Sequence, residues 1–531
     1  MNSLASIHKC AGRLFMALAA ITSLLLLGAC GSSSSSSGNQ VGFSNSSLNG
    51  TYVFSSTGTD STTGAFLAAA GAITADGSGH ITGGNVDLVD PNENAVSQAV
   101  TGSYTINQDG RGLISIAIPT AGTFVFDIVL YSTNHGLVTE FDGFGSGSGT
   151  IDLQTSLTGV SQLAGAYALS MAGTDINGNP AATAGSFTLN SSGAVSAGYQ
   201  DVNDNGFQYS GSIQTTSGVT SLGTGTAPGT FTLTGPFGTA TYDFYPVDAT
   251  HVKFIETDYN NFLAGDVYTQ TGAAIPASNV AFTMGGTDSN GPIGVGGLAT
   301  TDASGNFTNG AVDVNDAGNV TTNPLSFSGS AGAAGVGGRV VVTLSGFYNS
   351  QKFVVYPTTN AGVLMLEADN AAVMLGAAYA QTGTSFAASE NYGMNLTGEN
   401  SVPAFVNIIA QFNTGSTTIS GLLDDNESGT LVQGTRLSGT YTAPTSGRGT
   451  IVVPSLAISN GGLGLYYYVV NGTTTLVLEG DQQQVTIGSF IQQTAPTSQA
   501  ALLHPMVALM HPANHAHGAV KPGQKWTPQN K

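Results

Sequence analysis

The sequence is poor in charged residues. It holds 31 Asp or Glu and 11 Lys or Arg, so charged residues make up 8% of its 531 positions, against about 25% in ordinary domains. The net charge of −20 and the shortage of Lys and Arg argue against nucleic-acid binding, which needs clustered cations. Strong helix formers such as Lys, Glu and Arg are few as well, which disfavours a helical protein.

Cysteine is nearly absent, with only Cys10 and Cys30 in the chain. A disulfide framework is therefore excluded, and stability must come from packed cores. What the sequence does have is 74 glycines and a hydrophobic content of 41%. That combination is not typical of disordered chains, and it indicates a folded protein with many turns.

The N-terminus has the pattern of a secretory signal. Lys9 and Arg13 precede an apolar run over 14–27, which is too short for a membrane span of about 20 residues. The run ends in Leu27-Gly28-Ala29-Cys30, which resembles the lipobox of bacterial lipoproteins. The alternatives are an ordinary signal cut after Ala29, or a chance cysteine.

The resemblance implies that residues 1–29 are removed and that Cys30 carries acyl chains, which anchor the protein outside the cytoplasm. In that family, Gly31 after the cysteine favours the outer membrane, on either its periplasmic or its surface side. Residues 30–46, with serines at 32–37, then form a flexible tether.

Four internal repeats follow the tether. Each has a Glu-x-Asp pair, a Gly seven residues after the Asp and a Gln twelve residues after it, and the Gln residues are spaced by 116, 111 and 112. A second mark, Gly-x-x-Asp, recurs with the same period and ends at Asp87, Asp201, Asp313 and Asp424. Two marks with one period indicate duplication.

Within each repeat, about eight short runs rich in β-branched and aromatic residues alternate with Gly-rich turns. We therefore predict an all-β protein of four tandem repeats, each an eight-stranded antiparallel up-and-down barrel, since closure removes exposed edges. In architecture only, the units look like avidin and lipocalin barrels. A β-sandwich and paired propeller blades are the alternatives. The predicted repeats are 47–155, 163–271, 277–382 and 386–494, followed by a tail over 495–531.

The Glu-x-Asp pairs are the main candidate sites. Residues i and i+2 of a strand share one face, so each pair places two carboxylates together. We expect a structural role, with calcium as an alternative and acid–base hydrolysis as a less favoured one; no other cofactor is expected. The pairs are Glu140 and Asp142, Glu256 and Asp258, Glu367 and Asp369, and Glu479 and Asp481.

Three arginines occupy similar positions near the fifth strand of their repeats. We expect Arg111 to pair with Glu140, Arg339 with Glu367 and Arg448 with Glu479, while the second repeat has no Arg there. Tyr131, Tyr245, Tyr356 and Tyr468 also recur, and they are expected in the core or, alternatively, as stacking platforms for sugars.

The tail differs from the repeats because it has no acidic residue and holds a histidine cluster. His504, His511, His515 and His517 form a candidate metal site, and a mobile cationic tail is the alternative.

The sequence as a whole predicts a membrane-anchored, extracytoplasmic lipoprotein with a structural, adhesive or multivalent binding role and no enzymatic activity. A cell-surface glycan or protein is the expected partner. A small-molecule or glycan carrier that uses the barrel mouths is the second hypothesis, and a hydrolase with repeated acid pairs is the third.

Overall fold

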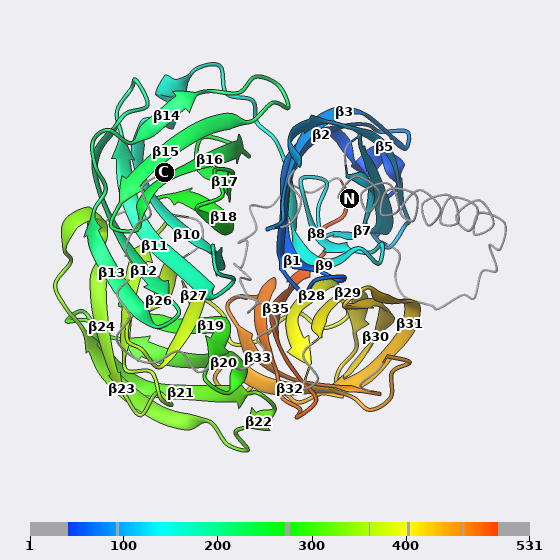
Figure 1. Ribbon diagram of the computed structural model, residues 1–531. Helices are drawn as coiled ribbons and strands as arrows, with labels where there is room; N and C mark the ends of the chain where they lie inside the picture. Colours follow the sequence, from blue (N-terminus) through cyan, green and yellow to red (C-terminus); the bar gives the residue numbers. More distant parts are fainter. Residues whose placement is uncertain are drawn as a thin grey trace, which may run out of the picture.

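The computed structural model describes residues 41–91, 95–119, 121–270, 275, 277–359, 362–400, 404–458 and 461–496. Within them the chain consists of antiparallel strands and three short 3-10 helices. The strands form four barrels in chain order, here called barrels 1 to 4 (Figure 1). The predicted all-β fold of four tandem, eight-stranded antiparallel barrels is confirmed.

The elements have the following bounds. Barrel 1 contains η1 (Asn45–Ser47), β1 (Asn49–Asp60), β2 (Phe66–Asp76), β3 (His80–Val89), β4 (Ala95–Ala99), β5 (Thr101–Ile106), β6 (Arg111–Ile118), β7 (Gly122–Leu130), β8 (His135–Glu140) and β9 (Gly145–Leu153). Barrel 2 contains η2 (Val160–Leu163), β10 (Gly165–Asp175), β11 (Pro180–Leu189), β12 (Val195–Asp204), β13 (Phe207–Ser212), β14 (Gly218–Ser221), β15 (Gly229–Gly235), β16 (Gly238–Pro246), β17 (His251–Glu256) and β18 (Asn261–Thr269).

Barrels 3 and 4 repeat this order. Barrel 3 contains β19 (Asn279–Asp288), β20 (Gly291–Thr301), β21 (Asn306–Asp316), β22 (Asn319–Val320), β23 (Leu325–Ala331), η3 (Val336–Gly338), β24 (Val340–Ser345), β25 (Lys352–Pro357), β26 (Val363–Glu367) and β27 (Ala372–Ala380). Barrel 4 contains β28 (Asn391–Asn400), β29 (Phe405–Thr414), β30 (Thr418–Glu427), β31 (Thr430–Tyr441), β32 (Arg448–Val453), β33 (Leu463–Val469), β34 (Thr474–Glu479) and β35 (Gln484–Gln492).

In barrels 1, 2 and 3 the fourth strand is split into two pieces, and barrel 2 differs from the others in its closure. Pairing of β2 with β3 closes barrel 1, pairing of β20 with β21 closes barrel 3, and barrel 4 is a closed ring of eight strands. In barrel 2 the ladder instead ends at β13 on one side and β14 on the other. An isolated bridge between Ala194 and Gly218 and a few backbone bonds hold these edges to their neighbours.

Apolar side chains fill the interior of each barrel. Alternate strand residues point inward, as Ile114, Ile116 and Ile118 do on β6, where all three are buried. Each barrel has a hydrophobic cluster built from its own strands. Burial of one such side chain contributes roughly 1.5–3 kcal/mol, so each repeat carries a core of its own.

The glycine of the repeated motif lies where the first and last strands of a barrel approach closely. A Cβ on Gly149 would lie 1.8 Å from the Ser55 carbonyl oxygen, and one on Gly488 would lie 1.9 Å from that of Asn395. Gly265 and Gly376 meet the Ser170 and Thr283 carbonyls at 2.1 Å. Only glycine fits this approach, which explains the motif position.

The four barrels pack side by side in a closed ring (Figure 1). One apolar cluster joins barrels 1 and 2, a larger one joins barrels 2, 3 and 4, and a third joins barrels 4 and 1. Strands that face a neighbouring barrel are consequently buried on both sides, which is why all residues of β26 and β34 are buried. The ring excludes a rod-like stalk for the described residues.

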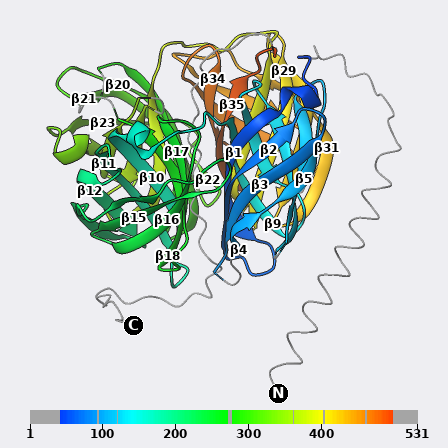
Figure 2. The same ribbon diagram turned by 90° about the horizontal axis from the view of Figure 1, so that it is seen from above.

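The ring has two different faces. The terminal face holds the starts of β1, β10, β19 and β28 and the ends of β9, β18, β27 and β35. Both ends of the described chain lie there, because Phe43 and Gln493 both approach Gly110. The turn face, opposite, holds the β8–β9, β17–β18, β26–β27 and β34–β35 turns. Figure 2 shows the barrels from the side of the ring.

Candidate functional site

The four motif glutamates lie inside the barrels at the turn face. They end β8, β17, β26 and β34, in phase with residues that fill the lumen, such as Met365 before Glu367. All four are at most 3% exposed. Burial and the neighbouring Asp raise the pKa of Glu256 to about 8 and of Glu367 to about 10, and burial raises the pKa of Glu140 and Glu479 well above its ordinary value.

The motif aspartates lie in the following turns and accept backbone hydrogen bonds. Asp369 accepts from the N–H groups of Ala371 within its own turn (3.0 Å) and of Gln351 (2.8 Å) and Lys352 (2.9 Å) beside it. Asp142, Asp258 and Asp481 likewise accept from their own turn and from the neighbouring sixth strand or the residue before it. Each Asp therefore fastens its turn to the adjacent strand.

Calcium at these acid pairs stays a prediction. Burial and the neighbouring Asp raise the pKa of each Glu and so favour its neutral form, whereas a hard cation binds ionised oxygens. Among the described residues, no group of three or more His, Cys, Asp or Glu side chains could hold a metal ion.

The arginine pairing that we expected needs correction. Arg339 forms a bidentate pair with Asp201 of the preceding barrel (2.6 and 2.7 Å), and Arg448 does the same with Asp313 (2.6 Å for both bonds). Arg111 lies 3.6 Å from Asp424 and 3.0 Å from Asp109. The motif glutamates point into the lumen, whereas the arginines project outward between barrels. The cations therefore join the Gly-x-x-Asp mark of one repeat to the next repeat.

The recurrent tyrosines are buried at the same junctions. The hydroxyls of Tyr245, Tyr356 and Tyr468 donate to Asp87, Asp201 and Asp313 at 2.7, 2.5 and 2.7 Å, and Tyr131 is also fully buried. Rings that are buried between barrels cannot act as stacking platforms for sugars, so that alternative is wrong.

Two amide side chains complete three of the four junctions, an unpredicted Asn and the motif Gln. Asn203, Asn315 and Asn426, two residues after the Gly-x-x-Asp mark, donate to backbone carbonyls at the acid turn of the next barrel. The motif Gln residues donate in the same way on the terminal face; Gln493 bonds the Asp109 and Leu130 carbonyls at 2.7 and 2.8 Å. Barrel 4 is thus bonded to barrel 1. The sequence does carry a signal for the Asn contacts, because an Asn recurs two residues after the Gly-x-x-Asp mark in three of the repeats.

The junction between barrels 1 and 2 departs from this pattern. Val89 stands where the other repeats have Asn, and Pro228 lies opposite Tyr245 where Arg448 lies opposite Tyr468. Asp87 instead faces Asp243, and Ser97 bonds both carboxylates. Burial and the charge of Asp243 raise the pKa of Asp87 to about 7.

A buried ionic network lies at this junction and was not predicted. The Lys253 ammonium lies 3.4 Å from Asp152 of barrel 1 and 3.3 Å from Asp266, while His135 and His251 contact the two aspartates at 3.0 and 2.7 Å. Lys253 is 1% exposed, and the aspartates raise its pKa against the effect of burial. The other repeats have Leu137, Leu364 and Leu476 at this position.

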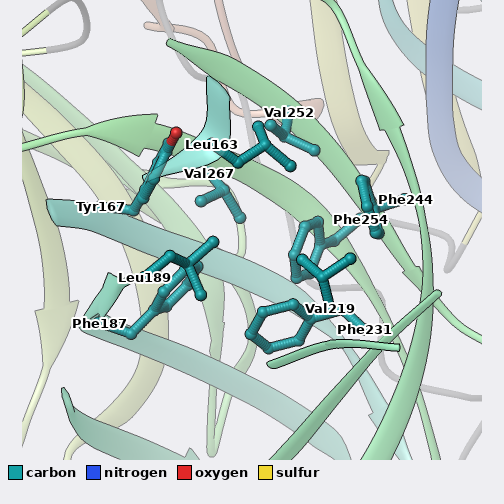
Figure 3. A pocket seen from close by; sticks show the side chains of 10 residues that line it. All are labelled: Leu163, Tyr167, Phe187, Leu189, Val219, Phe231, Phe244, Val252, Phe254 and Val267. Atoms are coloured by element: carbon teal, nitrogen blue, oxygen red, sulfur yellow. The ribbon is translucent and has the colours of Figure 1, made fainter. Parts of the chain in front are cut away.

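Barrel 2 also contains a cavity (Figure 3). Ten side chains line a cavity of about 20 Å³, room for about one water molecule, and all are apolar except for the Tyr167 hydroxyl. That hydroxyl already donates to the Ala249 carbonyl at 2.8 Å. Four phenylalanines dominate the lining: Phe187, Phe231, Phe244 and Phe254.

Several predicted sites lie outside the described residues. These are the lipidated Cys30 and the tail histidines His504, His511, His515 and His517. In the described part of the chain, no helix is long and apolar enough to cross a membrane.

No family model and no curated protein sequence matches this chain. Two solved structures are similar to it at a low level. Transferrin binding protein B of Haemophilus parasuis is 9% identical over 72% of this chain and 86% of that chain, with a TM-score of 0.18. Isotype 1 of the same protein from serogroup B Neisseria meningitidis is 10% identical over 69% and 86%, with a TM-score of 0.19. TM-scores this low establish no common fold.

Proposed function

We propose that this chain is a lipid-anchored, extracytoplasmic protein whose ring of four barrels presents a face for multivalent binding at the cell surface. The carrying observation is that both ends of the described chain lie on the terminal face. A tether that leads from Val41 back to Cys30 turns this face toward the membrane, and the turn face away from it. The role requires no catalysis.

The distribution of exposed apolar side chains supports the turn face as the binding face. Phe144, Ile176, Phe207 and Tyr259 are 42%, 59%, 44% and 47% exposed, and all four lie in or beside turns of that face. Exposed apolar groups that gather on one side of a molecule mark interaction sites. Several contacts on one rigid ring strengthen binding through avidity, with a glycan or a protein as partner.

The anchoring is tested by Cys30→Ser in cells fed a labelled fatty acid. We expect the wild type to carry the label and to sediment with membranes, and the variant to lose the label and leave the membrane fraction. An unlabelled wild type, or a variant that stays in the membrane fraction, contradicts lipid anchoring.

The binding face is tested by a variant that combines Phe144→Ser, Ile176→Ser, Phe207→Ser and Tyr259→Ser. Beads coated with the full chain should adhere to cell surfaces, and this variant should lose most of that adhesion. Val336→Ser is the matched control, because Val336 is 57% exposed but belongs to the β23–β24 connection on the terminal face. Equal loss in both variants, or loss in neither, refutes the assignment of the turn face.

A further inference from the structure

We propose that the turn-face ends of the four barrel lumens, here called the barrel mouths, bind Lys and Arg side chains of a partner protein. This inference rests on the proposed role of the turn face in binding, and it adds the chemical class of the partner. Its basis is a group of acidic residues around each motif glutamate.

Three positions at the mouth repeat in every barrel. The first ends the opening strand of the barrel and pairs, in the closing ladder, with the third residue after the motif Asp. The second lies three residues after the Asp of the Gly-x-x-Asp mark, and the third is the motif Glu. Eleven of these twelve residues are acidic, and the exception is an amide, Asn400. In chain order they are Asp60, Asp90 and Glu140; Asp175, Asp204 and Glu256; Asp288, Asp316 and Glu367; and Asn400, Glu427 and Glu479.

The acidic side chains lie on the lumen side of their strands. In barrel 3, Asp288 follows Met284 by four residues and Asp316 follows Val314 by two. Both apolar residues belong to the core of that barrel, and alternate residues of a strand share one face. Burial, together with the charge of Asp316, raises the pKa of Asp288. The two acids of this mouth are therefore close enough to repel each other.

A buried carboxyl oxygen lacks a hydrogen-bond donor in three of the mouths. Asp316 is 2% exposed, as is Asp425, which follows the core residue Leu423 of barrel 4 by two residues. The Oδ1 atom of each, like that of Asp204, has no hydrogen-bond partner in the protein. A buried acceptor without a donor is unfavourable, so these mouths favour a ligand that donates hydrogen bonds.

The charge of the mouths favours a cationic donor. Of the Lys and Arg side chains in the described chain, only Lys352 lies beside an acid turn of this face. A cation next to a buried carboxyl group favours its ionised form and makes charge-assisted hydrogen bonds with it. Since no group of three or more acidic side chains in the described residues could hold a metal ion, an organic cation is favoured. One acid in each mouth is partly exposed and gives access from solvent; these are Asp60, Asp204, Asp288 and Glu427.

Exposed apolar side chains beside the mouths favour a protein as the source of the cation. At the mouth of barrel 2, Ile176 directly follows Asp175, and Phe207 lies three residues after Asp204. The two apolar side chains are 59% and 44% exposed. Lys and Arg side chains have apolar stems that pack on such surfaces, and their charged ends interact with aromatic rings. Four mouths on one rigid ring strengthen binding to a single partner through avidity.

The experiment measures binding of fluorescently labelled oligolysine to the full-length chain in detergent by fluorescence anisotropy. We expect saturable binding of oligolysine and no binding of oligoglutamate of the same length. A variant that combines Asp204→Asn, Asp316→Asn and Glu427→Gln, here called the mouth variant, should bind oligolysine roughly tenfold more weakly, because it loses charge-assisted bonds.

A matched control removes the same charge elsewhere. Asp76→Asn, Asp248→Asn and Asp302→Asn together replace three acids in turns of the terminal face, so the net charge changes by the same amount and the affinity should stay nearly the same. Equal weakening in both variants shows a general attraction to an acidic chain and overturns the proposal. Unchanged binding in the mouth variant also overturns it.

A measurement on the wild type covers the case in which the mouth variant fails to fold. A carbodiimide couples carboxyl groups to the amines of bound oligolysine, and mass spectrometry locates the coupled acids. We expect coupling at Asp204, Asp288 and Glu427, and none at Asp76 or Asp302. Coupling that is spread evenly over both faces, or confined to the terminal face, refutes binding in the mouths.

The adhesion test separates this inference from the proposed function. If oligolysine does not bind, but adhesion is still lost with the four exposed apolar side chains, the turn face remains the binding face and the cationic partner is wrong. If the mouths bind oligolysine, but adhesion does not depend on the turn face, the proposed function is wrong and the mouths remain sites for cationic side chains.

Discussion

At the residue scale, the described chain is characterised by buried carboxyl groups that have no Lys or Arg as an ion-pair partner. Glu256 and Glu367 are buried beside an aspartate, and burial raises their pKa to about 8 and about 10. Burial likewise raises the pKa of Glu399 to about 8 and that of Asp204 and Asp425 to about 7. For such a group the folded state holds its proton more tightly than the unfolded state does. Its stabilising effect is complete below the unfolded pKa and is lost as the pH rises to the folded value.

We therefore expect the protein to be most stable in mild acid. Between pH 5 and pH 8, each of these carboxyl groups should lower the unfolding free energy as the pH rises. The decrease is about 1.4 kcal/mol per pH unit within the range between the unfolded and the folded pKa of that group. Glu367→Gln keeps a neutral amide in place of the protonated acid and should flatten the dependence of melting temperature on pH. Lys352→Gln, an exposed neighbour at the same face, is the control. An unchanged pH profile in Glu367→Gln shows that Glu367 is ionised in the folded protein.

Lys253 is the second residue that decides stability on its own. Its removal leaves Asp152 and Asp266 facing each other without the ammonium group between them. Lys253→Leu copies the residue of the other three repeats, but it should cost roughly 3–5 kcal/mol. Urea unfolding at neutral pH measures this cost, and adding Asp152→Asn should recover part of it. No loss in the single variant shows that the network does not stabilise the junction.

At the scale of elements, the register between the fifth and sixth strands determines how closely the arginine of one barrel approaches the aspartate of the previous barrel. Arg448 lies opposite Tyr468 in the ladder, and Val340 opposite Val355 sets Arg339 opposite Tyr356. Both arginines reach the aspartate of the previous barrel with two bonds. Arg111 lies opposite Val129, two residues before Tyr131, and its guanidinium stays 3.6 Å from Asp424. A shift of two residues thus weakens the ion pair.

The junction between barrels 1 and 2 has the same strand register as the Arg448 junction. It lacks the guanidinium cation, because Pro228 stands at the position of the arginine. We expect Pro228→Arg to pair with Asp87 and Asp243, lower their pKa and raise the melting temperature above pH 7. Pro228→Met removes the proline without adding charge and serves as the control. The two melting curves, recorded from pH 5 to pH 8, should diverge with rising pH. Parallel curves show that the side chain at position 228 does not reach Asp87.

At the scale of the whole molecule, the ring closes between its first and last barrels. Asn426 and Gln493 of barrel 4 donate to carbonyl groups of barrel 1, and a small apolar cluster lies beside them. Every barrel thus has two neighbours, although the chain is linear. The last barrel stabilises the first across more than 360 residues of sequence.

A circular permutant tests this closure. New ends between barrels 2 and 3, near residue 275, with the old ends joined by a flexible linker, should leave the ring intact. We expect one calorimetric transition within a few degrees of the wild type, because all four junctions are kept. Two separate transitions in the permutant show that the contact between barrels 4 and 1 is too weak to hold the ring together.

Local signals in the sequence were sufficient for the repeat, the strands and the barrel. Alternating apolar residues, Gly-rich turns and the motif glycine reflect conformational preferences of short segments. They can therefore be recognised in the sequence without knowledge of the tertiary structure. The partners of Arg339, Arg448 and the recurrent tyrosines could not be read, because a periodic motif does not say whether its partner lies in the same repeat or the next. Tertiary structure also decided the raised pKa of Glu367 and the burial of Lys253. These depend on which surfaces meet and on how completely their side chains fill the space between them.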